Sequence, residues 1–292
     1  RLFGIPAVGT MAHSWIQMFD SEYEAFKAYA ETYPNDCTLL LDTYDVLGSG
    51  LPNAIRVFDE YLKPKGITPA GVRIDSGDVT YLTRCIRSRL DAAGYTKTKI
   101  VVSNALDEYL IRDLLSQGAC IDTFGVGERL ITSRSEPVFG GVYKLCAVED
   151  SAGRILPKIK ISENVAKITT PHFKKLWRFY NPNGMAIADV LSLHSETIDE
   201  SQPFELFHPE FTWKKKVISN FTVKQLLQPI FQNGRLVYDI PSLSEVCRYA
   251  ADCVDHLWDE VKRFDNPHDY YVDLTRPLWE IKQRMLAGRG QL

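Results

Sequence analysis

A histidine with small and hydroxyl-bearing neighbours lies near the start of the chain, in the stretch Gly9-Thr10-Met11-Ala12-His13-Ser14. Imidazole in a loop of this composition can meet an anionic ligand, with hydroxyl and backbone N–H donors on both sides of the ring. Thr10, His13 and Ser14 are therefore candidate contacts for a phosphate-bearing molecule. A histidine that caps a turn would give the same local sequence. The residues downstream help to decide between a ligand-binding histidine and a turn histidine.

Two short acidic motifs supply carboxylates that could act with this histidine. The first is Asp42-Thr43-Tyr44-Asp45, in which Asp42 or Asp45 could fix the tautomer of His13 and raise the basicity of its other ring nitrogen. Asp42 could instead cap the helix that follows it. The second motif is Asp75-Ser76-Gly77-Asp78, with two carboxylates around a flexible glycine.

Arg73 lies two residues before Asp75 in a predicted strand, so the two side chains share one face and can pair. The pair could be a buried salt bridge that supports the fold. It could also belong to a site in which Asp75 holds the hydroxyls or the bound Mg²⁺ of a phosphorylated sugar, or stabilises positive charge at its anomeric carbon. Ser76 and Gly77 are candidates for binding the same substrate.

A third group of candidates could hold a phosphate. Gly125-Val126-Gly127 offers backbone N–H groups that no side chain obstructs, which suits a phosphate. Tight turns use the same residues, so Gly125 and Gly127 are weak evidence when taken alone. Ser103 and Asn104, which end a preceding apolar run, are candidate polar contacts to the same ligand.

The elements that must position these residues are alternating strands and helices. Four aliphatic stretches that are too short for helices are predicted as strands, at 37–41, 71–74, 99–102 and 120–124. Between them, apolar residues recur at helical spacing: Val79, Leu82, Ile86 and Leu90, then Leu106, Leu110 and Leu114, with Gly118 as a stop signal. Each polar motif follows one strand, and parallel sheets and barrels carry their sites at that edge. The four motifs therefore predict one site, in an α/β domain at 1–140.

The pattern changes after Gly140-Gly141. Closely spaced strands are predicted at 142–149, 158–161, 176–180, 185–193 and 235–240, with turns at Asn183-Gly184 and Asn233-Gly234, which indicates a mostly antiparallel β-rich domain at 141–240. A helical region is predicted at 241–292. Ser242 with Glu245 forms a possible capping box there, and a last helix is expected between Thr275-Arg276-Pro277 and Gly288.

Bulk properties narrow the classes of function. The 292 residues carry a formal net charge of -3, so we expect no general attraction to nucleic acid or to anionic membranes. No apolar run is long enough to span a bilayer. The six cysteines lie mostly in apolar runs without CxxC pairs, so buried, reduced thiols and a cytoplasmic location are expected. The remaining histidines lack metal-ligand spacing, and Trp177, Trp258 and Trp279 fit core or interface positions.

Taken in order, the motifs resemble the nicotinate phosphoribosyltransferases, a type II phosphoribosyltransferase family. The resemblance is carried by residues 9–14, 41–45, 72–78, 102–107, 122–127, 140–145, 158–164, 237–243, 266–268 and 278–279. It covers nearly the whole chain. Each segment alone is weakly specific, but this many segments in the family's order are not expected by chance.

The resemblance implies an irregular, incomplete (β/α) barrel with a second β-rich domain and a helical C-terminus. It implies transfer of phosphoribosyl from phosphoribosyl pyrophosphate to nicotinate, which gives nicotinate mononucleotide and pyrophosphate in NAD biosynthesis. Mg²⁺ is implied as cofactor and ATP as co-substrate, together with a homodimer that shares its active site. By the same resemblance His13 is the histidine that ATP phosphorylates, Asp75 lies near ribose and metal, and Gly125 and Gly127 hold the nucleotide phosphate.

Arg73 and Asp42 also match positions of the family's motifs, with less defined roles. Glu128 stands where many members have threonine, so we leave it out of the site. The family also has a long segment before the histidine motif, which carries an arginine for the nicotinate carboxylate and aromatic residues that sandwich the ring. We therefore expect this sequence to be a fragment whose base pocket that segment completes.

Three alternatives stay open on the sequence alone. The first is the related nicotinamide-specific phosphoribosyltransferase, although Gly9-Thr10-Met11-Ala12-His13-Ser14 favours the nicotinate form. The second is a non-catalytic domain that binds nucleotide or dimerises, which the expected lack of the upstream segment makes reasonable for the isolated fragment. The third is an unrelated barrel enzyme that handles sugar phosphates, which would keep the glycine loop but would give no reason for a phosphorylated His13.

Overall fold

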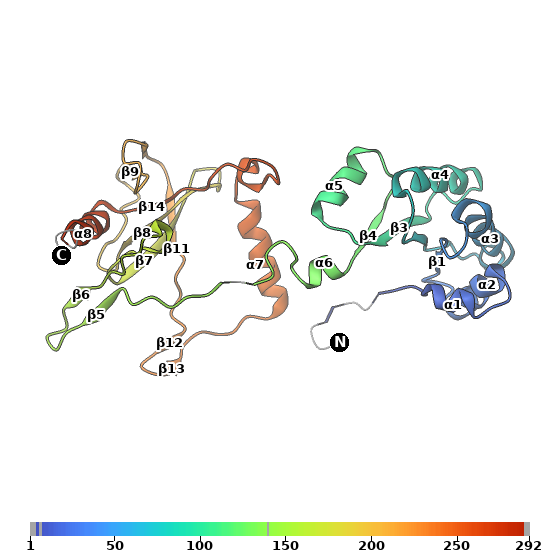
Figure 1. Ribbon diagram of the computed structural model, residues 1–292, viewed down its shortest axis with the longest axis horizontal. Helices are drawn as coiled ribbons and strands as arrows, with labels where there is room; N and C mark the ends of the chain where they lie inside the picture. The colour runs from blue at the N-terminus through green and yellow to red at the C-terminus, as the bar shows by residue number, and fades with distance from the viewer. Residues whose placement is uncertain (1–3, 6–7, 139, 289–292) are drawn as a thin grey trace. The chain divides into compact units, whose positions relative to one another are not determined.

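The computed structural model describes residues 4–5, 8–138 and 140–288 (Figure 1). The chain divides into two compact units, unit 1 (Arg1–Gly140) and unit 2 (Gly141–Leu292). Compact units do not by themselves define domains, so the three-part division at 140 and 240 stays a prediction. Each unit is described separately below.

A parallel sheet forms the centre of unit 1, as the sequence predicted. Its strands are β1 (Thr38–Leu40), β2 (Gly71–Ile74), β3 (Lys99–Asn104) and β4 (Thr123–Val126), hydrogen-bonded in the order β1-β2-β3-β4. All three pairings are parallel, which places the carboxyl ends of the four strands at one edge. Among the described residues the sheet is open, with β1 and β4 at its edges, so the predicted barrel is not seen as a closed structure.

Helices cover this sheet and complete one apolar core. They are α1 (His13–Gln17), α2 (Glu22–Thr32), η1 (Val46–Gly50), α3 (Leu51–Val57), η2 (Phe58–Leu62), η3 (Lys63–Lys65), α4 (Val79–Ala92), α5 (Glu108–Ser116) and α6 (Glu128–Ile131). Leu40, Val72, Ile74 and Val102 from the strands are fully buried with Phe26 and other side chains from the helices. Burial of most residues of β1 and β2 explains why these strands read as continuous apolar runs, whereas β4 has no buried residue.

Aspartates begin the two long helices that follow strands in unit 1. Asp78 accepts a hydrogen bond from Tyr81 N at the start of α4, and Asp107 accepts one from Leu110 N at the start of α5. The apolar repeat predicted from Leu106 onward therefore begins one residue before the cap rather than inside the helix.

Unit 2 is β-rich. Its strands are β5 (Ala147–Glu149), β6 (Ile155–Pro157), β7 (Lys174–Tyr180), β8 (Ala186–Leu193), β9 (Phe204–Phe207), β10 (Lys215–Ile218), β11 (Thr222–Gln225), β12 (Phe231–Gln232), β13 (Arg235–Leu236) and β14 (Val272–Leu274). The largest sheet has the order β11-β7-β8-β14, in which only β14 pairs in parallel. The prediction of mostly antiparallel pairing is confirmed, although the sequence did not indicate β9, β10, β11 or β14.

Turn chemistry corrects three of the predicted strands. Asp150 accepts hydrogen bonds from Ala152 N and Arg154 N, so the chain reverses at once and the partner of β5 is 155–157 rather than 158–161. Only the last three residues of the predicted strand 142–149 pair. Asn233 and Gly234 both have positive φ and form a two-residue hairpin turn, but that hairpin pairs only as far as Leu236, not to residue 240.

The helical end of the chain begins and ends largely as predicted. Its helices are α7 (Leu243–Asp255) and α8 (Arg276–Ala287), and the turn η5 (Asp259–Lys262) and strand β14 lie between them, so the region predicted as helical also contains a strand. The turn η4 (Val165–Lys167) lies earlier in unit 2. The capping box of Ser242 and Glu245 is present at α7, and Pro277 opens α8. α7 ends at Asp255, short of the apolar positions predicted up to Val261, and none of its residues is buried.

Two predictions from composition can be compared with the structure. All six cysteines are free, as expected of reduced thiols, but only Cys37 is buried and Cys247 is exposed. The expectation of generally buried thiols was therefore wrong: Cys85, Cys120, Cys146 and Cys253 are half-buried, and α7, which carries Cys247 and Cys253, has no buried residue. No helix in the described part of the chain is long and apolar enough to cross a membrane.

Candidate functional site

The candidate site lies at the carboxyl edge of the parallel sheet in unit 1. Parallel register places Arg73 beside Leu40 on one neighbouring strand and beside Val101 on the other, and it places Ser103 beside Gly125. Polar residues that are far apart in the sequence therefore meet at this edge, as the strand order predicted.

Arg73 joins three of the predicted site residues. Its Nε donates to Ser103 Oγ at 2.7 Å, and one terminal nitrogen donates to Thr10 Oγ1 at 2.9 Å. The other terminal nitrogen lies 3.4 Å from Asp75 Oδ2, so the pair predicted from strand alternation is present. The Arg73 and Asp75 side chains are 22% and 31% exposed, so the pair is accessible rather than sealed in the core. A guanidinium held from three sides is pre-organised to meet an anion.

Asp42 connects the histidine to the loop after β2. Its Oδ2 accepts hydrogen bonds from Asp75 N at 2.9 Å and from Ser76 Oγ at 2.5 Å. Its Oδ1 lies 3.9 Å from His13 Nε2, and the side chain is 2% exposed. Oδ1 is buried without a hydrogen-bond partner among the described residues. A buried acceptor without a hydrogen bond lowers the stability of the folded state by about 1–3 kcal/mol. An acceptor left in this state is typical of a group that interacts with a ligand or with a charged ring.

His13 is the first residue of α1, and its imidazole is held on both sides. Nδ1 lies 3.1 Å from Thr43 Oγ1, opposite the approach of Asp42 to Nε2. The His13 side chain is 40% exposed, so it is accessible to a ligand. Thr43 was part of a predicted motif but was not among the predicted site residues. Its hydroxyl is a short polar group beside the acidic position, and only the fold shows that it reaches the imidazole.

The glycines of the site differ in backbone conformation and in the space that a side chain would have. Gly77 has φ +82°, and a Cβ there would lie 2.9 Å from Leu82, so the turn after β2 requires glycine. At Gly125 a Cβ would come within 3.3 Å of Ser103 Cβ on the neighbouring strand. Around Gly127 the space is open. Asn104, at the end of β3, has φ +133°, a strained backbone of the kind that clusters at functional sites.

Two residues that the site prediction passed over join the loops after β3 and β4. Arg129, on α6 directly after the glycine loop, forms an ion pair with Asp107, the cap of α5. The hydrogen bonds from Leu110 N and Arg129 lower the pKa of Asp107 below its usual value. The available signal was an arginine two positions after Gly127, but its partner Asp107 lies 22 residues earlier, in the loop after β3.

Some predicted residues lie outside this network. Asp45 does not reach His13, because its Oδ1 accepts hydrogen bonds from Leu47 N and Gly48 N and so caps η1. Ser14 is exposed on α1, and Asn104 Oδ1 accepts from the next residue along, Ala105 N.

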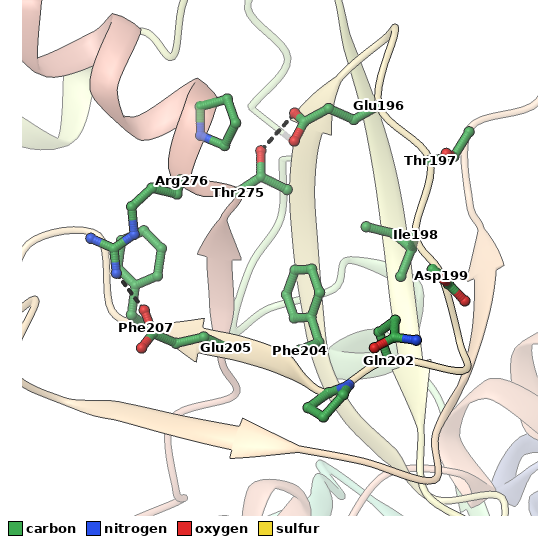
Figure 2. Close-up of a pocket in the computed structure, with 12 residues that line it drawn as sticks. Glu196, Thr197, Ile198, Asp199, Gln202, Phe204, Glu205, Phe207, Thr275 and Arg276 are labelled. Atoms are coloured by element: carbon green, nitrogen blue, oxygen red, sulfur yellow. Dashed lines mark hydrogen bonds and ion pairs between the residues drawn. The ribbon is translucent and has the colours of Figure 1, made fainter.

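A pocket in unit 2 contains none of the predicted site residues. Its volume is about 320 Å³, and it lies at the start of α8 (Figure 2). Two of its acidic side chains are already paired, because Thr275 donates to Glu196 at 2.8 Å and Arg276 forms an ion pair with Glu205. We assign no ligand to it.

The carboxylates of the site suit a magnesium ion that a substrate brings with it. Within the described ranges, no three His, Cys, Asp or Glu side chains gather closely enough to hold a metal on their own. Asp75 offers one half-exposed carboxylate, and Mg²⁺ is commonly held by one or two carboxylates together with substrate phosphates and water.

The fold and site define an α/β protein: an arginine, two aspartates, a histidine and a glycine loop lie at the carboxyl edge of its parallel sheet, where proteins of this class commonly bind ligands. A model of the nicotinate phosphoribosyltransferase C-terminal domain matches residues 173–282. The nicotinate phosphoribosyltransferase of Bacillus subtilis is 43% identical over 287 residues, which are 98% of this chain and 58% of that protein. That of Dictyostelium discoideum is 32% identical over 275 residues, 89% of this chain and 46% of that protein.

A solved structure agrees with these relatives. The crystal structure of human nicotinic acid phosphoribosyltransferase superposes with a TM-score of 0.74 at 25% identity, over 98% of this chain and 63% of that one. The chain therefore belongs to the nicotinate phosphoribosyltransferase family. It spans about half the length of the curated relatives described above.

Proposed function

We propose that this chain carries the catalytic loops of a nicotinate phosphoribosyltransferase, which transfers phosphoribosyl from phosphoribosyl pyrophosphate to nicotinate and couples the transfer to ATP hydrolysis. The observation that carries the proposal is the Asp42 carboxylate, which contacts the Asp75 loop through one oxygen and approaches His13 with the other. The relatives described above are named as nicotinate enzymes, so the nicotinamide-specific alternative is not favoured.

In this proposal His13 accepts the terminal phosphoryl group of ATP. A ring nitrogen forms a bond to phosphorus while the bond from phosphorus to ADP breaks. The imidazole gains positive charge in this step, and the buried Asp42 carboxylate 3.9 Å from Nε2 stabilises that charge. Thr43 holds the ring in place from its other side.

Phosphoribosyl transfer takes place at the Asp75 loop. The bond from the anomeric carbon to pyrophosphate breaks, and the nicotinate ring nitrogen bonds to that carbon. Asp75 faces the positive charge that develops on the sugar, while Arg73, with Thr10 and Ser103, faces departing phosphate oxygens. The remaining predicted contacts, Ser14, Ser76, Gly77, Asn104, Gly125 and Gly127, complete the phosphate-binding edge. Mg²⁺, held by Asp75 and the substrate, would neutralise phosphate charge.

The proposal also covers the barrel architecture, the oligomeric state and the location of the protein. β1 to β4 would form part of an irregular (β/α) barrel, which the strand–helix order supports. A homodimer with a shared site and a cytoplasmic location follow from the family resemblance and the composition, respectively.

Product formation tests the proposed function. We expect native protein with phosphoribosyl pyrophosphate, ATP and Mg²⁺ to form a mononucleotide from nicotinate far faster than from nicotinamide. Asp75→Asn should lower kcat about 100-fold or more, as expected when a charge-stabilising group is lost. A folded native protein that binds ATP but forms no product would favour a purely binding role.

A further inference from the structure

A cavity of about 1070 Å³ in unit 2 takes no part in the site described above. It lies between β9 and β10 on one side and the chain from Trp258 to Asp273 on the other. That chain includes Asn266-Pro267-His268, a segment of the family resemblance for which the proposed reaction provides no role. We propose that this cavity binds a nucleoside phosphate whose base carries an exocyclic amine, with the base against Trp258, His268 and Tyr271 and the phosphates at Lys214 and Lys216.

Three aromatic rings form one wall of the cavity. Trp258 lies 6.0 Å from both His268 and Tyr271, and the latter two are 5.6 Å apart, measured between ring centres. His268 Nδ1 donates to Asp269 O at 2.7 Å, which leaves Nε2 free to accept a hydrogen bond. Tyr271 remains 43% exposed although it packs in this cluster. Aromatic rings that are held by one another and open on one side can stack on a planar base.

Ammonium groups form the opposite wall. Lys214, Lys215 and Lys216 all line the cavity, and Lys215 pairs with Glu205 at 3.5 Å. Lys214 Nζ lies 5.0 Å from the ring centre of Phe211, which also lines the cavity, and Lys216 stands opposite Leu206 on β9. Neither Lys214 nor Lys216 has a carboxylate within salt-bridge distance among the described residues. Two ammonium groups at the mouth of an aromatic cavity suit a phosphate group.

The carboxylates of the cavity narrow the choice of ligand. Glu260 is balanced by Arg263, whose guanidinium lies 3.8 Å away and also lines the cavity. Asp269 is exposed at the rim. Asp273 is 4% exposed and accepts a hydrogen bond from the backbone N–H of Phe207, and a carboxylate has further lone pairs that can accept another. A buried carboxylate beside aromatic rings recognises the amine edge of a base such as adenine.

Photolabelling locates the site without reliance on activity. Native protein is irradiated with 8-azido-ATP, digested, and the labelled peptides are identified by mass spectrometry. We expect label between Trp258 and Asp273, in addition to any label in unit 1. His13→Asn should leave the label in unit 2 unchanged, which separates this proposal from the proposed function. Absence of label from that segment at saturating probe would overturn the proposal.

Variants and competitors test the chemistry of the cavity. Lys216→Glu should weaken labelling about tenfold, as loss of one charge-assisted contact does, while Lys167→Glu, an exposed lysine outside the cavity, should have no effect. ATP should compete about tenfold better than ITP, which lacks the exocyclic amine. Equal competition by ATP, ITP and inorganic triphosphate would overturn the proposal, as would a Lys216→Glu protein that is folded and labels normally.

Discussion

Asp42 Oδ1 lies 3.9 Å from Nε2 of His13 and has no hydrogen-bond partner among the described residues. The other oxygen of the same carboxylate holds the backbone and hydroxyl of the loop that begins at Asp75. One buried side chain therefore connects the proposed phosphoryl acceptor to the proposed sugar-binding loop. Its charge, rather than a direct hydrogen bond, acts on the imidazole.

Removal of that charge should slow phosphorylation of His13. Asp42→Asn keeps the shape and an acceptor for Asp75 N, so we expect little change in the free energy of unfolding. The rate of phosphohistidine formation should fall about 10- to 100-fold, the usual effect of losing a carboxylate that orients a histidine. Rapid-quench labelling with ATP measures the rate.

Asp45→Asn is the matched control for Asp42→Asn. Asp45 lies in the same motif but caps η1, and asparagine is also a good cap, so phosphorylation should proceed at the native rate. If both variants lose the same activity, the effect belongs to the loop and not to the Asp42 charge.

The Asp107–Arg129 ion pair should position the glycine loop. Arg129→Ala removes the link between α6 and the cap of α5. We expect KM for phosphoribosyl pyrophosphate to rise about tenfold, which corresponds to about 1.4 kcal/mol, with a smaller change in kcat. Arg134→Ala, at an exposed position in the same segment, should change neither constant.

A double-mutant cycle tests whether the pair acts as one unit. Asp107→Asn keeps the helix cap but weakens the pairing with Arg129, so its effect and that of Arg129→Ala should be non-additive. Additive effects on KM would show that the two residues act independently.

Two glycine substitutions separate folding from binding. Gly77→Ala should destabilise the protein by more than about 1 kcal/mol, because the residue has φ +82° and a Cβ would press on Leu82. Gly127→Ala meets open space, so its free energy of unfolding should change less while KM for phosphoribosyl pyrophosphate rises. Denaturant unfolding and steady-state kinetics on both variants check this. An unchanged KM for Gly127→Ala would remove that residue from the site.

The parallel sheet could be predicted because its strands are short aliphatic runs that are bounded by polar motifs and alternate with helical patterns. Strand order then brought Arg73, Asp75 and Asp42 to one edge, as inferred. The contacts of Thr43 and Arg129 could not be predicted, because their partners, His13 and Asp107, are distant in the sequence and no periodic signal links them. In unit 2, β10 begins with the charged pair Lys215-Lys216, and only β9 opposite gives it strand character.

Burial of Asp273 should make the stability of the protein depend on pH. Burial raises the pKa of this carboxyl to about 6. Because the folded-state pKa lies above the unfolded value, the group favours the folded state most below about pH 4, and this contribution is lost as pH rises through about 6. Between those limits the loss should be on the order of 2 to 3 kcal/mol.

Asp273→Asn should remove this component of the pH dependence. Urea unfolding of both proteins from pH 4 to pH 7 measures it, and the variant should gain stability relative to the native protein as pH rises. Parallel stability curves would show that Asp273 does not titrate near pH 6.

Phosphorylation of His13 tests the central claim most directly. Native protein is incubated with γ-³²P-ATP and Mg²⁺, and the labelled peptide is identified under alkaline conditions that preserve phosphohistidine. We predict an acid-labile label on His13, its loss in His13→Asn, and normal labelling of His172→Asn, a histidine of unit 2. Equal labelling of His13→Asn and the native protein would contradict the account.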